Sequence, residues 1–407
     1  MIEPGTLLTL AIDKPAAGGR MLARHEGQVV LVWGGIPGER VTARVERLGK
    51  GVLYAETVEV LEASPDRLDI GAIDWRCGGN VFAHIAYERQ RQLKGEILRD
   101  ALGRIGRLPL AAAPDVIGSP QQGYRMRARL HARGGRLGFY REGTHDLCDA
   151  GATGQLLPDT VAWIAAAEAI LQRGRLDGVL AVEIAENIPA DERATHVELR
   201  QGVAPAAYAA LTTERTSVTD VLHIKESDPS IALRLRRDVH AFFQGNRFLL
   251  ERLVHHVVAL VPAGPVVDLY AGVGLFGLSL AATGAEEVTL VEGDPVSGGD
   301  LTGNAEPFFD RVRVERRSVE AFLTMRSDSA PPATFIVDPP RTGMSRDAMR
   351  EIVRASPVRL VYVSCDVATF ARDTRTLLDA GYALDSLSGI DLFPNTAHVE
   401  TIALFRR

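Results

Sequence analysis

Three short segments near the C-terminal end of the sequence contain side chains capable of covalent and acid–base chemistry. Tyr-Val-Ser-Cys365 ends an apolar run with a lone thiol, and the end of a buried strand is a position where a nucleophile can be mounted. In Val-Asp338-Pro-Pro-Arg, two prolines stop strand pairing and helix formation, which leaves Asp338 able to hydrogen-bond a planar base or amide. In the third segment His398 and Glu400 are two residues apart, so on a strand they share a face.

Each of these features also has a purely structural interpretation. A lone cysteine is most often a small buried hydrophobic residue. Asp338 and its prolines can form an ordinary turn, and His398 with Glu400 can be a surface pair on an edge strand. The position of Cys365 at a strand end, beside a segment that looks like a cofactor site, favours the catalytic interpretation.

A glycine-rich segment supplies the candidate cofactor site. Asp268-Leu-Tyr-Ala-Gly-Val-Gly-Leu-Phe-Gly277 matches GxGxxG, whose glycines let the backbone approach a nucleotide. Glu292 ends the next apolar run, twenty residues past Gly272, where a carboxylate would meet ribose hydroxyls. The pattern suits a dinucleotide and S-adenosylmethionine (SAM) equally. The acid-Pro-Pro strand end at Asp338 is common in SAM-dependent nucleic-acid methyltransferases and unusual in dehydrogenases, so it favours SAM.

The elements that would position these residues form a regular α/β alternation after Asp238. Six strand candidates alternate with helical or loop segments, and most read as buried runs of a parallel sheet. In a doubly wound sheet, ligands bind at the carboxyl ends of the strands, so the chemistry is expected there. The strand candidates are VVDLYA, EVTLVEG, RVRVERR, TFIVDPP, RLVYVSC and TIALF.

The first part of the chain has a different pattern. Residues 1–62 alternate apolar and polar residues in five short runs broken by glycine turns, which predicts a small OB-like β-barrel. Residues 63–66, Ala-Ser-Pro-Asp, then predict a linker. A basic amphipathic helix over 84–105 and an arginine-rich hairpin over 124–140 follow.

These patterns predict a multidomain α/β protein. It has an N-terminal OB-like β-barrel, an α+β central domain and a C-terminal Rossmann-like domain of the class I methyltransferase type. The expected boundaries are 1–62, 63–237 and 238–407. A length of 407 residues suits two or three domains.

Charge is distributed unevenly along the chain. The net charge is −6, but between Arg76 and Arg141 thirteen Lys and Arg residues stand against four acids. A basic segment on an acidic protein indicates a phosphate-bearing partner, because neutralisation of the nucleic-acid backbone supplies most sequence-independent affinity. The alternative is a solvated face whose arginines make surface ion pairs. The charge distribution therefore favours a phosphate-bearing partner such as a nucleic acid.

The sequence also favours a cytoplasmic location. The first ten residues carry an acid and no base, unlike a secretory signal. The longest charge-free stretches, around Asp268, contain prolines and glycines that do not suit a membrane span. Three cysteines, Cys77, Cys148 and Cys365, are too few and too scattered for a disulfide framework, which suits a reducing compartment.

Five motifs in order resemble the RNA uracil-5-methyltransferase family, whose members make 5-methyluridine in tRNA or 23S rRNA. They are FFQGN at 242–246, DLYAGVGLFGL, DPPR, YVSC and FPNTAHVE. The N-terminal barrel resembles that family's TRAM domain. The resemblance implies that Cys365 is the nucleophile and Glu400 the base. It also implies that SAM is held by residues matching the family's cofactor positions: Gln244, Tyr270, Glu292 and Asp338.

Residue chemistry agrees with that implication. C5 of uracil is too weak a nucleophile to attack a methyl sulfonium until a thiolate adds at C6 and creates an enolate. A carboxylate such as Glu400 can then remove the C5 proton, and elimination releases the enzyme. The target base must also leave its stack in folded RNA.

Two positions depart from the family pattern. Leu275 stands where many relatives place an Asn that contacts SAM. The segment Cys77-Gly-Gly-Asn80 resembles the family's CGGC iron–sulfur segment, but only Cys77 and Cys148 have counterparts in its four-cysteine set. Because a four-iron cluster usually needs four thiolates, we expect no iron–sulfur cluster and no bound metal. The two cysteines are then relics in a region held by hydrogen bonds and packing.

Three other functions stay open from the sequence. An NAD-dependent oxidoreductase would explain GxGxxG but leaves Cys365 and Glu400 without a role. A non-catalytic RNA-binding protein with a decayed methyltransferase domain fits the change at Leu275 and the missing cysteines. Cytosine-5 methylation uses similar thiol chemistry with different surrounding motifs. The RNA and the uridine do not follow from the sequence, because site choice depends on RNA shape and base contacts.

Overall fold

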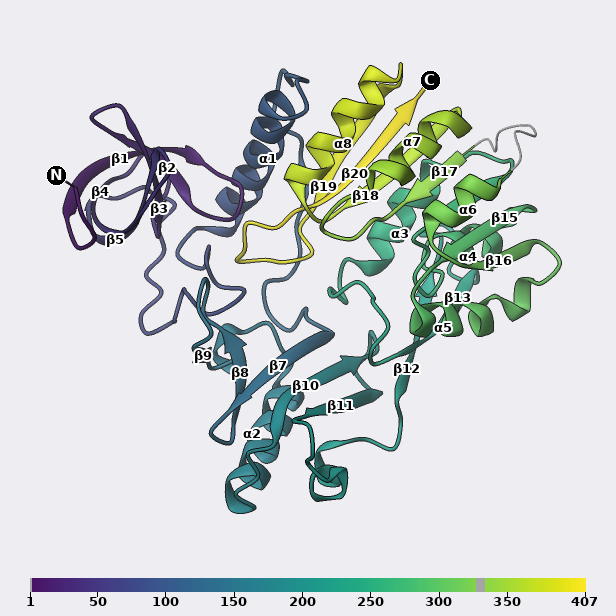
Figure 1. Ribbon diagram of the computed structural model, residues 1–407, viewed down its shortest axis with the longest axis horizontal. Helices are drawn as coiled ribbons and strands as arrows, with labels where there is room; N and C mark the ends of the chain where they lie inside the picture. Colours follow the sequence, from purple (N-terminus) through teal and green to yellow (C-terminus); the bar gives the residue numbers. More distant parts are fainter. Residues whose placement is uncertain (1, 327–333) are drawn as a thin grey trace.

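The computed structural model describes residues 2–326 and 334–407. Figure 1 shows a small barrel at the N-terminal end, a second sheet formed by the teal central part, and a large sheet with helices in the C-terminal part. The expected fold class is therefore confirmed. Within the two described ranges, no helix combines the length and the apolar character needed to cross a membrane.

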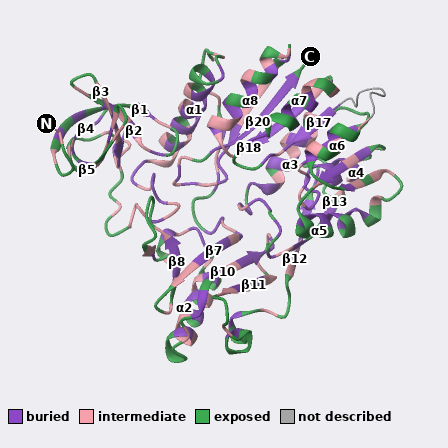
Figure 2. Ribbon diagram, in the orientation of Figure 1, coloured by how far each residue is buried: buried purple, intermediate pink, exposed green. Residues whose placement is uncertain are grey.

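The N-terminal strands close into a five-stranded barrel with the order β1-β2-β3-β5-β4. Along β1 exposed and buried residues alternate, because successive side chains of a strand point to opposite faces. Leu8, Leu10 and Ile12 thus point into the barrel core, which is coloured purple in Figure 2. The strands are β1 (Leu7–Pro15), β2 (Met21–His25), β3 (Gln28–Trp33), β4 (Arg40–Gly49) and β5 (Val52–Glu62).

The central part is built on a five-stranded sheet with the order β11-β10-β7-β8-β9. The predicted hairpin is present as β7 and β8, joined at Gly134 and Gly135, which both have positive φ. Helix α2 packs on this sheet. The elements are β7 (Arg127–Arg133), β8 (Arg136–Tyr140), β9 (Leu147–Cys148), η1 (Gly151–Thr153), α2 (Pro158–Arg173), β10 (Val179–Glu186), β11 (Arg193–Leu199) and η2 (Pro205–Leu211).

A two-stranded hairpin that the sequence analysis did not predict connects the central part to the C-terminal part. Its strands are β12 (Ser217–His223) and β13 (Ala232–Asp238), and β13 packs against α5. Between the two strands, Arg237 Nε lies 2.8 Å from Asp220 Oδ2, and both side chains are fully buried. A second ion pair, Arg247 to Glu186 at 2.8 Å, joins the segment before α3 to the end of β10.

The C-terminal sheet has eight strands in the order β16-β15-β14-β17-β18-β20-β19-β6. The first five are parallel, whereas β20 runs antiparallel between β18 and β19. The strands are β14 (Val266–Leu269), β15 (Val288–Glu292), β16 (Val312–Arg316), β17 (Thr334–Val337), β18 (Arg359–Ser364), β19 (Ala383–Ile390), β20 (Glu400–Arg406) and β6 (Val116–Ile117). The helices are α3 (Leu250–Ala259), α4 (Gly277–Ala282), α5 (Pro295–Ala305), η3 (Glu306–Phe308), α6 (Val319–Met325), α7 (Arg346–Ala355) and α8 (Val367–Asp379).

All six strands predicted after Asp238 are present in this sheet. The sequence analysis did not predict β19 or β6, and it did not predict that β6, from the central part of the sequence, pairs with β19. The expectation that His398 and Glu400 lie together on a strand was wrong, because β20 begins at Glu400 and His398 precedes it in the loop.

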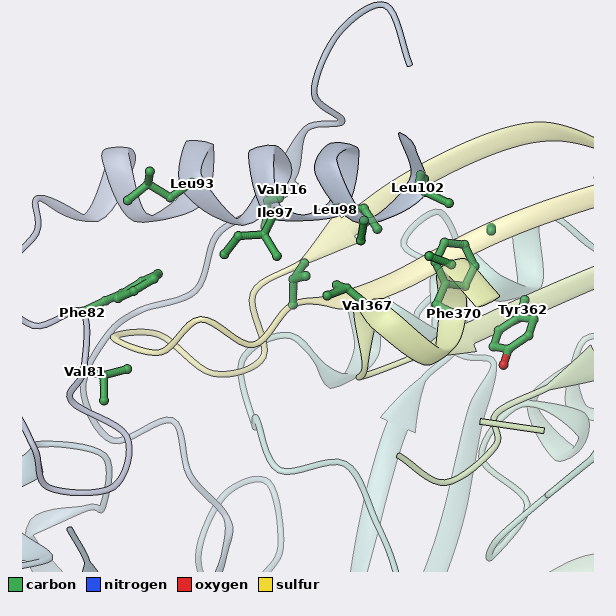
Figure 3. Close-up of a cluster of buried hydrophobic side chains, with 14 of the residues drawn as sticks. Val81, Phe82, Leu93, Ile97, Leu98, Leu102, Val116, Tyr362, Val367 and Phe370 are labelled. Carbon is green, nitrogen blue, oxygen red and sulfur yellow. The ribbon is translucent and has the colours of Figure 1, made fainter. Parts of the chain in front are cut away.

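The predicted basic helix is α1 (Tyr87–Arg104), and it packs against α8. Figure 3 shows its apolar stripe of Leu93, Ile97, Leu98 and Leu102 facing Val367 and Phe370 at the start of α8. Leu93, Leu98 and Leu102 are completely buried. A helix from the central part of the sequence therefore completes the core of the C-terminal sheet.

Buried polar side chains of α1 hold the loop between β19 and β20. Lys94 Nζ forms a fully buried ion pair with Asp391 and donates to Phe393 O at 3.0 Å. Gln90 makes a reciprocal pair of hydrogen bonds with Asn395, donating to Oδ1 and accepting from the backbone N–H, both at 2.9 Å. The loop 391–399 is therefore fixed by residues about three hundred positions earlier in the chain.

Replacing Lys94 by Met leaves Asp391 buried without its cation. We expect the free energy of unfolding to fall by about 3–5 kcal/mol, because removing one partner of a buried pair leaves an uncompensated charge. Urea denaturation of purified protein measures the change. Lys14→Met is the control, since Lys14 pairs with Asp100 at a partly exposed site where a loss of about 0–1 kcal/mol is expected. Equal effects in the two variants would contradict this role of Lys94.

Candidate active site

Gln244 is positioned by backbone pairing with the central part of the chain. The N–H of Met126 donates to Gly245 O at 3.0 Å, and the N–H of Arg247 donates to Tyr124 O at 2.9 Å. These bonds align the segment that contains Gln244 with the chain entering β7. Its side-chain amide then donates to Asp338 Oδ2 at 3.3 Å. Gln244 and Asp338, 94 residues apart, thus meet at the sheet edge.

The glycine-rich loop after β14 is open on one side and tightly packed on the other. Glu292 Oε2 accepts the N–H of Gly272 at 2.7 Å, and Asp268 Oδ2 accepts the N–H of Gly277 at 2.8 Å. A Cβ at Gly272 would meet nothing within 4 Å, whereas a Cβ at Gly277 would lie 2.1 Å from Leu290. The loop therefore needs glycine at 277 for packing and leaves free space beside 272. Tyr270, at its start, adopts a positive φ of 61°.

Three carboxyl groups gather where β14, β17 and β20 meet the crevice. Burial raises the pKa of Asp338 to about 7 and that of Asp268 to about 8. Burial also raises the pKa of Glu400 well above its usual value, and the charge of Asp338 adds to the effect. Among the described residues, none hydrogen-bonds to Glu400 Oε1. Because burial away from water disfavours the charged form, these three carboxyls hold their protons more tightly than exposed carboxyls do.

Cys365 follows β18 directly and precedes Asp366, which caps the N-terminus of α8. Burial, together with the charges of Glu400 and Asp338, raises the pKa of its thiol to about 12, and the Arg341 guanidinium acts in the opposite direction. The thiol is thus protonated at neutral pH when no substrate is bound. Arg341 is the neighbouring cation that favours the thiolate.

Cys365 lies in a cavity of about 400 Å³ lined by three parts of the chain. The barrel contributes its β1–β2 turn at Ala17 and Gly18, and the C-terminal part contributes Arg341, the start of α8 and the loop 393–399. His398 lines this cavity and is exposed, whereas Glu400 is only 2% exposed. The central part contributes Gly78, Gly79, Arg125, Arg129, His131, Phe139, Tyr140 and Glu142.

The structure therefore brings the six predicted site residues to one edge of the C-terminal sheet, in two groups. Gln244 and Asp338 are hydrogen-bonded, and the charges of Asp338 and Glu400 act on the Cys365 thiol. Tyr270 and Glu292 lie at the glycine-rich loop after β14.

Comparison with known proteins identifies the family. Residues 304–407 match the model of the tRNA (uracil-5-)-methyltransferase family, and residues 3–58 match the TRAM domain. A Halomonas elongata protein named 23S rRNA (uracil(1939)-C(5))-methyltransferase RlmD is 32% identical over 97% of this chain and 88% of its own length. A Corynebacterium efficiens protein named an uncharacterized RNA methyltransferase is 31% identical over 100% of this chain and 96% of its own length.

The chain belongs to the RNA uracil-5-methyltransferase family. It is a SAM-dependent RNA (uracil-5-)-methyltransferase with an N-terminal TRAM domain. The fold agrees with the solved structure of a Pyrococcus abyssi tRNA (uracil-54, C5)-methyltransferase in complex with S-adenosyl-L-homocysteine. That structure has a TM-score of 0.76 and 22% sequence identity, and the match covers 97% of this chain and 99% of the other.

The residues of this methyltransferase fit a SAM molecule at the glycine-rich loop. The open space at Gly272 and the fixed Glu292 carboxylate suit a nucleoside whose ribose hydroxyls need acceptors. Leu275 is 7% exposed and packs in the apolar core with Phe276, so its side chain offers SAM no polar contact.

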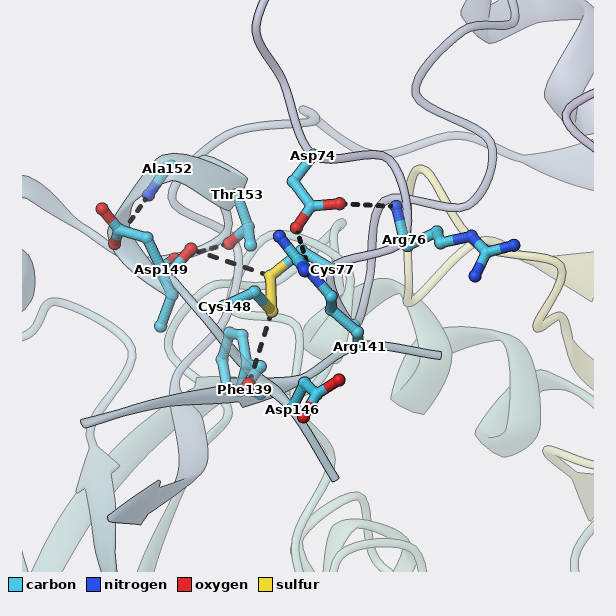
Figure 4. Close-up of a disulfide and its surroundings, with 12 residues drawn as sticks. Asp74, Arg76, Cys77, Phe139, Arg141, Asp146, Cys148, Asp149, Ala152 and Thr153 are labelled. Carbon is cyan, nitrogen blue, oxygen red and sulfur yellow. Dashed lines mark hydrogen bonds and ion pairs between the residues drawn. A yellow bond between two sulfur atoms is a disulfide. The ribbon is translucent and has the colours of Figure 1, made fainter. Parts of the chain in front are cut away.

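The residues at the CGGC-like segment do not fit an iron–sulfur cluster. Cys77 and Cys148 are joined by a disulfide, shown in Figure 4, so both sulfurs are already bonded to each other. Asn80 is buried and supplies no thiolate. The prediction that Cys77 and Cys148 are relics in a region held by hydrogen bonds and packing was wrong, because the pairing of distant cysteines depends on the fold and not on their spacing. That the purified methyltransferase lacks a cluster stays a prediction.

Several residues of the cavity were missed by the sequence analysis. Arg341 was quoted only as the end of the DPPR motif, although its charge acts on the Cys365 thiol. Arg125 was counted in the basic segment without a place in the site. Residues alternate from Arg125, just before β7, to Arg129 within it, with both arginines on the face opposite Ala128 and Leu130, and this pattern is the signal that could have found them.

The disulfide leaves Cys365 as the one free thiol among the three cysteines. Alkylation of the denatured, unreduced methyltransferase is expected to label Cys365 alone, and labelling after reduction should add Cys77 and Cys148, as counted by mass spectrometry. Reduction should also lower the free energy of unfolding by about 2–4 kcal/mol, because the cross-link closes a long loop. A brown, iron-rich preparation in which all three cysteines are labelled without reduction would contradict both the disulfide and the absence of a cluster.

The raised pKa of Cys365 predicts slow alkylation at neutral pH. Below the pKa of a thiol, the thiolate fraction rises about tenfold per pH unit, so the iodoacetamide rate should climb from pH 7 to 9.5 without a plateau. Arg341→Gln should slow labelling at every pH, because the cation that lowers the thiol pKa is gone. Arg354→Gln, at an arginine that does not line the cavity, serves as the control. A plateau near pH 8.5, the behaviour of an ordinary thiol, would be the opposite result.

Proposed function

We propose that this methyltransferase transfers a methyl group to C5 of a uridine in structured RNA through a covalent bond between Cys365 and C6. The observation that carries the proposal is the free thiol of Cys365 in an open cavity, with the carboxyls of Asp338 and Glu400 close enough to shift its pKa. A nucleophile and a proton acceptor on two sides of one base are what C5 methylation needs.

In the first step, Cys365 loses its thiol proton to water in the cavity, and the sulfur adds to C6 of the uracil. The electrons of the C5–C6 double bond move through C5 onto O4, which makes C5 nucleophilic. Arg341 stabilises the thiolate. Asp338, fixed by Gln244, lies at the strand end where it can hydrogen-bond the planar base.

SAM, when bound, would supply an electrophilic methyl group to C5 and would leave as the neutral thioether S-adenosylhomocysteine. Glu400 then removes the C5 proton, the C5–C6 double bond forms again, and the bond from C6 to Cys365 breaks. Its raised pKa makes the ionised Glu400 carboxylate a stronger base than an exposed one. In this proposal Gln244, Tyr270, Glu292 and Asp338 hold SAM, Asp338 also hydrogen-bonds the target base, and Cys365 and Glu400 act on that base.

RNA is the substrate class that the cavity suits, since residues of three domains line it. We place the domain boundaries at 1–62, 63–237 and 238–407, although α1 and β6 of the middle segment pack on the C-terminal sheet.

The relatives named for 23S rRNA favour that RNA over tRNA. A substrate of this kind implies a cytoplasmic enzyme that needs no obligate protein partner. Mass spectrometry of rRNA and tRNA from cells lacking the protein, looking for one missing 5-methyluridine, identifies the target.

Two variants test the mechanism on an RNA fragment that contains that uridine. Cys365→Ala should lose all methyl transfer and yet bind the RNA. Glu400→Gln should transfer a methyl group once and accumulate a covalent protein–RNA complex, because the C5 proton stays in place and elimination cannot occur. Denaturing gels with radiolabelled SAM measure methyl transfer and the covalent complex, and a filter-binding assay measures RNA binding by Cys365→Ala.

Glu306→Gln, an exposed glutamate outside the cavity, should behave like the unmodified enzyme. Undiminished methylation by Cys365→Ala would overturn the covalent mechanism. RNA binding without methylation by the unmodified enzyme, in the presence of SAM, would instead support a non-catalytic RNA-binding protein.

A further inference from the structure

Two walls of the catalytic cavity differ in chemistry. One wall belongs to the C-terminal domain and holds Cys365 and the start of α8, whereas the other is the hairpin of β7 and β8. In Figure 1 this hairpin lies below the yellow loop that joins β19 to β20. The proposed mechanism uses the first wall alone, so the hairpin wall has no assigned task.

The hairpin wall contains an assembled stack of aromatic rings. His131 on β7 and Tyr140 on β8 lie with ring centroids 3.7 Å apart and an interplanar angle of 11°. His131 pairs across the hairpin with Gly138, so Tyr140 is its diagonal neighbour, and glycine places no side chain beside the rings. The exposed His145 meets the edge of Tyr140 at 5.2 Å.

These rings are not needed to close the hydrophobic core. Ala128 and Leu130, which alternate with His131 along β7, are buried in the core of the central domain with Leu137. His131 and Tyr140 are both only half-buried, and both line the cavity that contains Cys365. Aromatic surface of this kind, in a cavity that takes RNA, is a stacking surface for a base.

Charge beside the rings completes a nucleotide site. Arg125 lines the same cavity, and its guanidinium donates to two neutral acceptors, Arg127 O at 3.0 Å and Gln155 Oε1 at 2.7 Å. Within the described residues, no carboxylate forms an ion pair with Arg125. Arg129 is different, because Glu183 and Glu198 both bind it. Arg125 therefore offers an uncompensated positive charge to a phosphate.

We propose that His131 and Tyr140 form a stacking platform for a nucleobase next to the target uridine. Arg125 binds the phosphate of that neighbouring nucleotide. This inference rests on the proposed function, since the neighbour is defined by the uridine that reaches Cys365. A base that leaves its stack exposes its neighbours, and a protein ring that stacks on one of them compensates for the lost contact. The platform thereby contributes to the choice of uridine.

The test uses RNA fragments that carry the target uridine, with an abasic nucleotide placed in turn at each of three positions on either side. With the unmodified enzyme, one of these positions should raise KM by roughly tenfold or more, the effect of losing one base–aromatic stack. Tyr140→Ala should raise KM by a similar factor on intact RNA. On the RNA that is abasic at that position, Tyr140→Ala should raise KM no further.

Three controls separate the platform from a structural effect. Tyr140→Phe keeps the ring and should restore KM, and kcat at saturating RNA should change little in all variants. Phe309→Ala removes an aromatic ring that is 85% exposed beside β16, at the far edge of the sheet from β6, and should leave KM unchanged. Thermal unfolding and SAM affinity should be the same in Tyr140→Ala as in the unmodified enzyme.

Normal methylation with an unchanged KM in Tyr140→Ala and His131→Ala would overturn the platform and leave the proposed function standing. Additive losses in Tyr140→Ala and the abasic RNA would also overturn it. If the unmodified enzyme methylates no uridine, the proposed function fails, and binding of single-stranded oligouridine is compared instead. In that case equal affinity of Tyr140→Ala and the unmodified protein would overturn the stacking role.

Discussion

The buried ion pair between Lys94 and Asp391 is the contact on which the geometry of the catalytic cavity depends. It joins α1 to the start of the loop that runs to Glu400, and both side chains are fully buried. A buried charge without its partner costs several kcal/mol, so the two segments are strongly held together. The hydrogen bonds between Gln90 and Asn395, whose φ is 62°, fix the middle of the same loop. The cavity wall is thus set by a helix outside the Rossmann-like domain.

The surroundings of Cys365 raise the pKa of its thiol and so keep the nucleophile protonated at neutral pH in the absence of substrate. Burial and the nearby carboxyls of Asp338 and Glu400 raise the pKa of the Cys365 thiol, and Arg341 opposes them. The same burial raises the pKa values of Asp338 and Glu400 above those of exposed carboxyls. A thiol that is protonated at rest reacts slowly with other electrophiles. The cost is a small thiolate fraction, which the substrate complex must increase.

The disulfide and the aromatic hairpin lie next to each other. Gly78, beside Cys77, donates its N–H to Tyr140 O at 3.1 Å, and Gln155 Nε2 donates to Gly78 O at 2.9 Å. The covalent bond between Cys77 and Cys148 therefore braces the segment that supports Tyr140 and lines the cavity. In this chain a cross-link holds the region that resembles the iron–sulfur segment of the family.

Local patterns in the sequence were sufficient for the domain types, the strand ends and the residues at those ends. Alternation and apolar runs identify β14 to β18, and the residue after each run is read directly, which is why Asp338 and Cys365 could be named. The tertiary structure alone decided which segments meet. Two contacts join segments distant in sequence: the packing of α1 on α8 and the disulfide. The stack of His131 on Tyr140 depends on the register of β7 and β8. A periodic pattern in the sequence reveals neither a long-range partner nor a strand register. The thiol pKa was also decided by the fold, because desolvation depends on everything packed around the group.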